Sequence, residues 1–291
     1  MHTHMMARTV AITLMLVGAS RLPAHAQAGT TAPAQAPATP QDQPPARSDR
    51  AVNPAEPDFT IIGLPTTLRI PRFGSAFRVT HRFTRPLGAG DFGSLLEDFF
   101  GFDGGAQIGL EYRFGMVAGT QIGIHRTSDR TIQFFLQHQV FRQGDRSPVT
   151  VDALATVDGT NNFRDSYSPA LGAVISRAFG RHGAVYLEPV WVNNTNDLPS
   201  EVVDDNDTFI IGVGGRVRVR PTLYVVAEMA PRFGYDPGVA HASFGIEKRA
   251  GGHSFQINFS NSFGTTMAQI ARGGFDNDDW YIGFNISRKF F

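Results

Sequence analysis

The chain has 291 residues, a formal net charge of zero, 31 glycines, 24 phenylalanines and no cysteine. Charged residues make up 18% of the chain, below the roughly 25% of an ordinary soluble domain. This composition excludes a disulfide scaffold and a thiolate zinc site. It also argues against a nucleic-acid partner, because basic residues are not in excess.

Residues 1–26 have the pattern of a secretory signal peptide. Arg8 supplies a positive start, residues 10–19 form a short apolar run, and residues 24–26 form a small-x-small cleavage site. We therefore expect the mature chain to begin near Gln27. The alternative is an N-terminal membrane anchor, but the apolar run is shorter than the ~18–20 residues that a spanning helix needs.

Two segments precede the regular pattern of the chain. Residues 27–57 carry seven prolines among Ala, Gln, Thr and Ser, with few large apolar residues. Such a segment buries too little surface to offset its ordering entropy, which predicts a disordered, partly polyproline linker. We assign residues 58–74 to a periplasmic lead-in before the first strand.

From Ser75 onward, apolar and polar residues alternate in stretches of about ten residues, a period that is typical of β-strands. In residues 105–114, Leu110 and Tyr112 fall on one face, whereas Glu111 and Arg113 fall on the other. About twelve strands are expected: 75–84, 105–115, 117–126, 131–142, 148–157, 167–179, 184–193, 208–220, 222–231, 240–248, 253–262 and 280–290. Helix is expected only within 93–100 and 265–272.

A soluble β-sandwich would also alternate, but three features favour a membrane barrel. The segments have the ~9–11 residues of a strand that crosses a bilayer, and their polar face is often charged. Short and long connections alternate, except that the join at 127–130 is short where a long one is expected. We predict an all-β fold, a transmembrane antiparallel up-and-down β-barrel of about 12 strands over residues 75–291. Both ends of the barrel domain are then periplasmic.

Charged residues on the polar face are the candidate lumen residues. We expect them to face the lumen or the periplasmic rim: Arg78, Arg82, Glu111, Arg113, Arg216, Arg218 and Glu228. Arginine rings in an open lumen favour anions. Alternatively, the arginines pair with the glutamates and fill a closed barrel. Both outcomes are open at about twelve strands, because eight strands are filled by side chains and 16–18 leave a channel.

No catalytic or metal site emerges from the residue spacing. The histidines are scattered, without a helical i, i+4 pair, so we expect no metal and no cofactor. A hydrolase at the barrel rim would need a serine, a histidine and an orienting acid. Ser243 follows His241 by two residues and Asp165 precedes Ser166, but neither spacing defines a triad. The long loops are acidic. Their carboxylates could bind a divalent cation, but their spacing fits no defined calcium loop, and we interpret them as a solvated face.

Several strings resemble a known family. These are residues 80–83, 100–103, 109–112, 251–256, 261–262 and 283–288, and together with the general pattern they cover roughly residues 60–291. The chain resembles the uncharacterised bacterial membrane β-barrel family called domain of unknown function 5777. The family-motif residues are His81, Arg82, Phe83, Gly252, His253, Phe255, Gln256, Asn285 and Arg288. The resemblance implies an outer-membrane β-barrel and supplies no established activity.

The leading functional hypothesis is a passive pore or transporter for small polar or anionic solutes in the outer membrane of a Gram-negative-type bacterium. The alternatives are a closed scaffold barrel that binds a periplasmic partner through residues 27–74, and a rim hydrolase. The expected partners are outer-membrane lipids, the outer-membrane assembly machinery and small solutes. The chain ends in Phe, as assembly signals do, although Phe290 rather than Phe291 is in phase with the apolar face.

Overall fold

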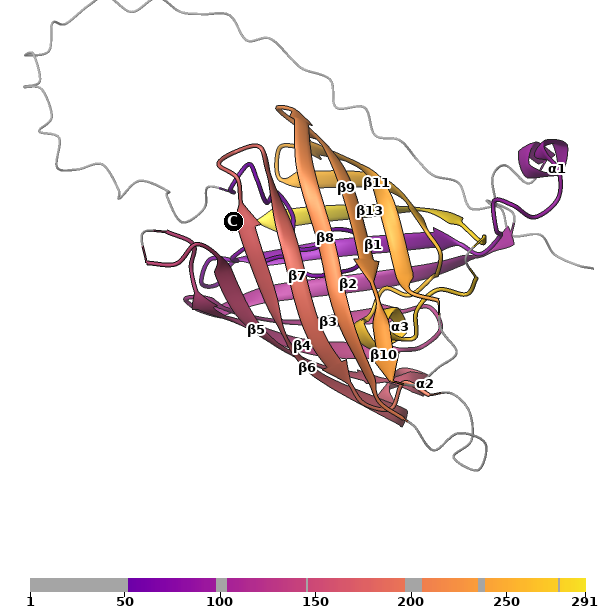
Figure 1. Ribbon diagram of the computed structural model, residues 1–291, viewed down its shortest axis with the longest axis horizontal. Coiled ribbons are helices and arrows are strands. Elements are labelled where there is room, and N and C mark those ends of the chain that lie inside the picture. Colours follow the sequence, from indigo (N-terminus) through magenta and orange to yellow (C-terminus); the bar gives the residue numbers. More distant parts are fainter. Residues whose placement is uncertain (1–51, 98–103, 145, 197–205, 235–238, 277) are drawn as a thin grey trace, which may run out of the picture. The chain divides into compact units, whose positions relative to one another are not determined.

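The computed structural model describes residues 52–97, 104–144, 146–196, 206–234, 239–276 and 278–291, which form a β-barrel (Figure 1). The elements in chain order are β1 (Ser75–Phe83), α1 (Phe92–Glu97), β2 (Ala106–Val117), β3 (Thr120–Thr127), β4 (Ile132–Phe141), β5 (Thr150–Gly159), α2 (Thr160–Phe163), β6 (Asp165–Ala178), β7 (Gly183–Val192), β8 (Thr208–Arg220), β9 (Leu223–Ala230), β10 (Arg232–Gly234), β11 (His241–Ala250), β12 (His253–Ser260), α3 (Met267–Ala271) and β13 (Tyr281–Phe290).

The sheet closes on itself through antiparallel pairs. Strand β1 pairs with both β2 and β13, with Val79 opposite Leu110 and Ile286. Strand β8 pairs with β9 and β10, which are separated by Pro231. Proline cannot donate to the ladder, so β9 and β10 form one interrupted strand. The result is a closed barrel of twelve strands, which confirms the predicted fold class.

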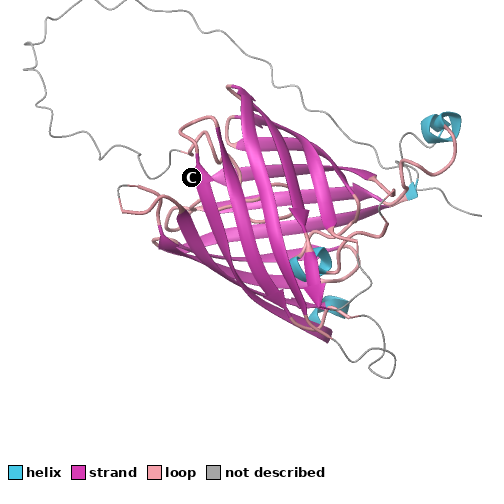
Figure 2. Ribbon diagram, in the orientation of Figure 1, coloured by secondary structure: helices cyan, strands magenta, loops and turns pink. Residues whose placement is uncertain are grey.

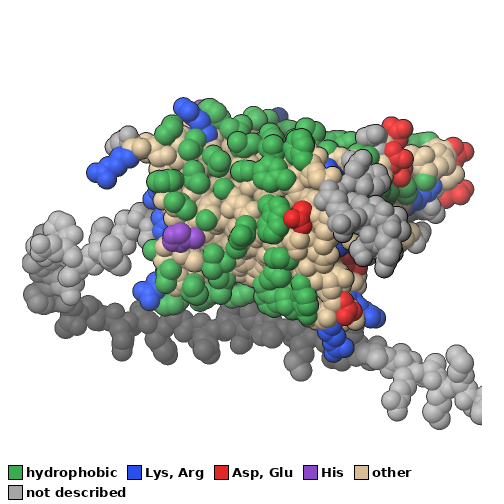
Figure 3. All heavy atoms as spheres, turned by 60° about the horizontal axis from the view of Figure 1, so that its bottom comes forward, with side chains coloured by type: hydrophobic (Ala, Val, Ile, Leu, Met, Phe, Trp, Pro, Cys, Tyr) green, Lys and Arg blue, Asp and Glu red, His purple; other side chains and the backbone are tan. Residues whose placement is uncertain are grey.

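The two faces of each strand meet different environments. On β2, Leu110 and Tyr112 are exposed on the outside, whereas Glu111 and Arg113 are buried inside. On the face of the barrel in Figure 3, hydrophobic side chains are spread along the wall and acidic side chains gather toward one end. Among the described residues, no helix is long and apolar enough to cross a membrane.

The barrel has two unlike ends. The turn end holds the start of β1, the end of β13 and tight connections such as that between β8 and β9. The loop end holds the longer connections and the three helices of the described residues (Figure 2). The connection after β3 is a tight turn there, closed by a bond from the Thr127 N–H to the Thr131 carbonyl (2.9 Å). Helix α1 overlaps the first segment where the sequence predicts helix, and α3 lies within the second.

Residues 53–72, called the plug below, lie inside the barrel. All of residues 55–68 are buried, and Thr60 pairs with Pro65 to form a tight hairpin. The sequence assigns 58–74 to a lead-in before the barrel, but in the structure residues 58–70 of this segment occupy its interior. A segment without strand periodicity gives no local signal that the inner faces of distant strands surround it.

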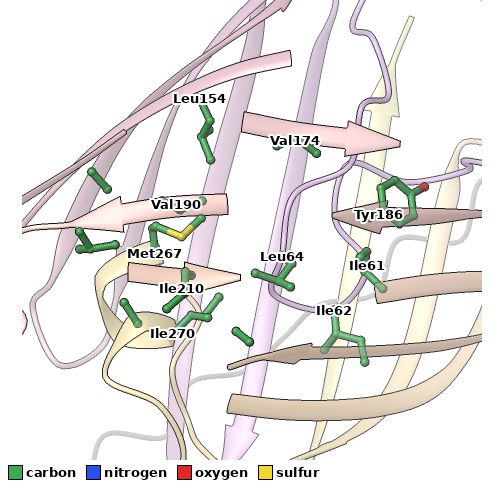
Figure 4. Packing of buried hydrophobic residues seen from close by; sticks show 14 of the residues in the cluster. Ile61, Ile62, Leu64, Leu154, Val174, Tyr186, Val190, Ile210, Met267 and Ile270 are labelled. Atoms are coloured by element: carbon green, nitrogen blue, oxygen red, sulfur yellow. The ribbon is translucent and has the colours of Figure 1, made fainter. Parts of the chain in front are cut away.

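The hairpin tip and α3 form an apolar cluster within the otherwise polar lumen. Ile61, Ile62 and Leu64 of the plug pack with Met267 and Ile270 of the α3 region (Figure 4). Inward-facing apolar side chains of β5 to β9 complete the cluster, including Leu154, Val174, Tyr186, Val190, Ile210, Tyr224 and Val226. Burial of this apolar surface stabilises the plug in place.

A second cluster explains the irregular C-terminus. Phe59, Leu68 and Ile70 of the plug pack near the turn end, and the ring of Phe291 contacts that of Phe59 (centroids 6.4 Å apart). Phe290 stays outside, with 53% of its surface exposed. The final residue, Phe291, departs from the inward and outward alternation of the last strand because its ring turns toward the plug.

Candidate functional site

The plug divides the lumen into a cavity at each end. The turn-end cavity has a volume of about 470 Å³ and is lined by the plug and by the ends of β4 and β6. The loop-end cavity has about 360 Å³ and is lined by residues such as Asp129, Ser262 and Gln269. Between them, beside Gly63 and Met267, lies a cavity of only about 30 Å³. In the described part of the chain the plug and α3 thus close the lumen.

Glu228 on β9 holds the tip of the plug. Its carboxylate accepts hydrogen bonds from the backbone N–H groups of Ile62 (2.9 Å), Gly63 (2.8 Å) and Leu64 (3.1 Å). Successive N–H groups that converge in this way form an anion-binding concavity. A Cβ at Gly63 would lie 3.2 Å from Glu228 Oε1 and 3.0 Å from Ile270 Cδ1, so glycine permits the close approach.

His241 on β11 connects Glu228 to the loop-end cavity. Its Nε2 lies 3.3 Å from Glu228 Oε1, and its Nδ1 lies 3.0 Å from the hydroxyl of Ser262, a residue that lines the cavity. The Ser243 hydroxyl is also near Nε2 (3.2 Å). These contacts form a continuous buried polar chain from the loop end to the plug tip.

A second set of contacts comes from β1 and β2. Glu111 forms ion pairs with both Arg78 and Arg113 inside the barrel. Arg78 also donates to the Thr60 hydroxyl (2.8 Å) and to the Ile62 carbonyl (3.1 Å). Arg113 lies over the ring of Phe59, 5.5 Å from its centroid. Both arginines thus neutralise a wall carboxylate and contact the plug.

Side chains from several other strands of the barrel bind the plug backbone. Arg216, which pairs with Glu247 (2.8 Å), donates to the Thr60 carbonyl (2.8 Å). Gln256 donates to the Ile61 carbonyl (2.7 Å), and Asn285 donates to the Ile62 carbonyl (3.0 Å). On β4, Gln137 donates to the Thr66 carbonyl (2.8 Å). Because these bonds come from strands all around the barrel, the plug is held at its centre.

The predicted lumen residues form two groups. Arg78, Arg82, Glu111, Arg113, Arg216 and Glu228 are all buried inside the barrel. Arg218 is half-buried at the turn end, where it donates to the Pro221 carbonyl (2.9 Å) rather than to the plug. Sequence reasoning missed Glu247 and Asp58, although the inward phase of Glu247 on its strand would have identified it.

The family-motif residues also separate by face. On the inside, Arg82 donates to Asn285 (2.9 Å) and Asn285 donates to Gln256 (2.8 Å), a network that reaches the plug. The other members do not join it. His81 stacks on Phe284 and packs near Phe83, His253 bonds Arg288 (2.8 Å), Phe255 is exposed outside, and Gly252 lies in the turn before β12.

The geometry around Ser243 differs from that of a serine hydrolase. In a catalytic triad the serine and the acid bind opposite nitrogens of the histidine. Here Ser243 and Glu228 share His241 Nε2, and Ser243 donates onward to Ser260 (2.9 Å). Asp165 accepts a bond from Asn161 at the loop end. No group of three potential metal-ligating side chains occurs among the described residues.

Asp58 anchors the plug to β13 near the turn end. Its carboxylate accepts bonds from the Ser287 hydroxyl (2.5 Å) and the Phe59 N–H (2.9 Å), and it lies 3.3 Å from the Lys289 ammonium. Burial alone would raise the pKa of Asp58, but the Lys289 charge and the Ser287 bond outweigh it and hold the pKa below the ordinary 3.8. The ionised carboxylate therefore stabilises the docked plug.

This lowered pKa predicts a pH dependence of stability. A carboxylate with a depressed folded-state pKa contributes fully above its unfolded pKa of 3.8 and loses that contribution as pH falls. In urea unfolding, the midpoint of the wild type should fall below about pH 4 more steeply than that of Asp58→Asn. At neutral pH the variant should lose about 3 kcal/mol, since Lys289 is left buried and unpaired. Asp278→Asn, at an exposed loop position, is the control; equal pH slopes in wild type and Asp58→Asn would contradict the assignment.

Comparison with solved structures shows that the barrel fold is shared with a known porin. The NanC porin matches with a TM-score of 0.50 and 7% identity over 75% of this chain and 99% of that one. An outer membrane channel from Pseudomonas putida F1 matches with a TM-score of 0.46 and 10% identity over 76% and 97%. Omp33 of Acinetobacter baumannii matches with a TM-score of 0.41 and 10% identity over 76% and 100%.

Comparison of the sequence with protein families gives one assignment. No curated protein sequence matches this chain. The model of the membrane bound beta barrel domain, DUF5777, matches residues 58–290. This match confirms the resemblance stated from the motifs, and it includes most of the plug as well as the strands. The chain belongs to the DUF5777 family of membrane-bound β-barrels.

Proposed function

We propose that the protein is an outer-membrane channel for small polar solutes whose lumen is closed by the plug and opens when the plug leaves its site. The observation that carries this proposal is the chemistry between plug and wall. Besides its apolar contacts, the plug tip is held by hydrogen bonds to wall side chains such as Glu228, Arg216 and Asn285. Such bonds exchange with water at a small net cost, so the same side chains suit a water-filled lumen.

The composition of the inner wall supports this function. A permanently filled barrel is stable with apolar packing, and buried ion pairs add little to stability. This inner wall nevertheless carries buried arginines and glutamates, among them Arg78, Arg82, Glu111 and Glu247. Since both signs are present, the wall favours polar solutes in general. The name of the NanC porin, which shares the fold, agrees with a pore.

Proposed orientation and partners follow from the barrel ends. The turn end faces the periplasm, because outer-membrane barrels have short periplasmic turns and long external loops. The outer face contacts outer-membrane lipids, and the terminal aromatic strand is the segment that the assembly machinery would bind. Hydrophobic side chains over the outer wall suit a lipid environment.

The closure of the lumen favours a second candidate, a scaffold barrel that never opens. The supporting observation is the cavity of only about 30 Å³ between the two ends. A periplasmic partner of such a scaffold would bind residues before Ala55, because residues 55–68 are buried inside the barrel. The two candidates differ in whether the plug moves.

A reversible crosslink between plug and wall tests the proposal. The hydroxyls of Thr67 in the plug and Ser176 on β6 lie 2.5 Å apart, close to the ~2.05 Å of a disulfide. Because the chain has no cysteine, Thr67→Cys with Ser176→Cys forms a single defined pair. In planar bilayers we expect channel openings from wild type and from the reduced double variant, and none from the oxidised one.

The single variants Thr67→Cys and Ser176→Cys are the controls and should open in both redox states. Openings that persist in the fully oxidised double variant would contradict a mobile plug. If neither wild type, the reduced variant nor a chain without the plug conducts, the channel is refuted and the scaffold barrel is supported.

A further inference from the structure

The turn-end cavity differs from the rest of the lumen in its charge. It has a volume of about 470 Å³, within the range of small-molecule sites. Three arginines line it: Arg69 and Arg72 from the plug, and Arg142 from the turn after β4. The acid among its lining residues is Glu56, so positive charge dominates the cavity.

Unlike Arg78, Arg113 and Arg216, these three arginines have no carboxylate at ion-pair distance among the described residues. Deeper in the barrel, Arg78 and Arg113 pair with Glu111, and Arg216 pairs with Glu247. By contrast, none of the three cavity arginines forms an ion pair with another described residue. The buried Nε of Arg69 has no hydrogen-bond partner within the described segments, as is also true of the Nε atoms of Arg78 and Arg216.

The neighbouring carboxylates are engaged elsewhere. Glu56 Oε1 accepts bonds from the Thr67 hydroxyl (2.9 Å) and from the Tyr186 hydroxyl (3.0 Å). Asp152 on β5 interacts electrostatically with Arg69, but it does not line the cavity, and its Oδ2 accepts a bond from Gln137 (2.7 Å). The cavity therefore keeps guanidinium groups available for a ligand.

We propose that the turn-end cavity binds a small solute with a carboxylate or phosphate group, held between Arg69 of the plug and Arg142 of the barrel wall. The planar guanidinium matches both groups through paired N–H donors. Because one arginine belongs to the plug and the other to the wall, the site is complete only while the plug is docked. The bound anion consequently favours the closed state of the barrel. The site itself requires only the docked plug, so anion binding does not depend on whether the barrel conducts.

Titration calorimetry of the full mature chain in detergent tests this site. The probes are citrate for carboxylates, inorganic phosphate for phosphates, and glucose as an uncharged solute. We expect saturable binding of citrate, phosphate or both, and none of glucose. The anion that binds identifies the chemical class.

Charge-removing variants locate the site. Arg69→Gln and Arg142→Gln should each weaken the affinity about tenfold, the loss of one charge-assisted contact. Arg146→Gln is the matched control, since Arg146 lies exposed near Arg142 but does not line the cavity. Arg142 is itself exposed, so its variant preserves the fold even if Arg69→Gln disturbs the plug.

Three outcomes would overturn the inference: no saturable binding of either anion by wild type, equal binding of glucose, or an equal loss of affinity in Arg146→Gln. These results are separate from the channel test, because the titration measures the closed barrel in solution. A barrel that never conducts but binds citrate through Arg142 would refute the proposed function and retain the site.

Discussion

A chain that lacks residues 27–72 is expected to conduct continuously, whereas the full chain opens rarely. A docked state that is more stable than the released state by about 3 kcal/mol leaves the channel open roughly 1% of the time. Removal of the plug therefore raises the time-averaged conductance about 100-fold. The physical reason is that water replaces the plug against the charged and amide side chains that the inner wall carries, such as Glu228, Arg216 and Asn285. Single-channel recording of the purified, folded chain measures this change.

Two controls accompany this deletion. A chain that lacks only residues 27–51 keeps the plug and should behave like the full chain. The folded state of each variant is checked by the migration shift between heated and unheated samples, since strands β1 to β13 remain intact. A folded barrel without the plug that conducts no better than the full chain would contradict plug closure.

Glu228→Ala should release the plug without shortening the chain. The three backbone N–H groups of Ile62, Gly63 and Leu64 lose their acceptor, and charge-assisted bonds are worth about 1.5–3 kcal/mol each. Since such losses are not additive, we expect a net cost of about 3 kcal/mol, which raises the open fraction roughly 100-fold. Conductance and tryptic cleavage after the half-buried Arg69 both report the released plug.

Glu188→Ala is the matched control for this variant. Glu188 is as deeply buried on the adjoining inner wall, but its carboxylate has no hydrogen-bond partner among the described residues. Conductance should therefore stay near that of the wild type. Glu228→Gln should give an intermediate effect, because it keeps one acceptor oxygen. Equal opening in the Glu188 and Glu228 variants would show that the bonds to the plug tip do not hold it.

The strands and their inward and outward faces are predictable because their signal is local. Each residue of a barrel strand faces either lipid or the lumen, so alternation within about ten residues records both faces. Leu110 and Tyr112 lie outside, and Glu111 and Arg113 inside, as their phase predicts. The break at Pro231 divides one expected strand into β9 and β10 and leaves the faces of the strands unchanged.

The candidate site was only partly predictable. Arg78, Glu111, Arg216 and Glu228 follow from the alternation, but their partners do not. Nothing in the sequence around Glu228 indicates that it binds the N–H groups of residues 62–64, which precede it by more than 160 positions. Likewise, the sequence leaves open whether the arginines line a pore or fill a closed barrel.

The sequence alone thus determines the wall, namely the fold class, about twelve strands, their approximate bounds and the polarity of each face. Only the tertiary structure decides what occupies the interior. Residues 53–72 are short, apolar at their tip and without period, so they suit a periplasmic segment as well as a plug. Their position depends on hydrogen bonds and apolar contacts from strands all around the barrel, including Arg78, Gln137 and Asn285. Those groups converge only after the barrel has closed.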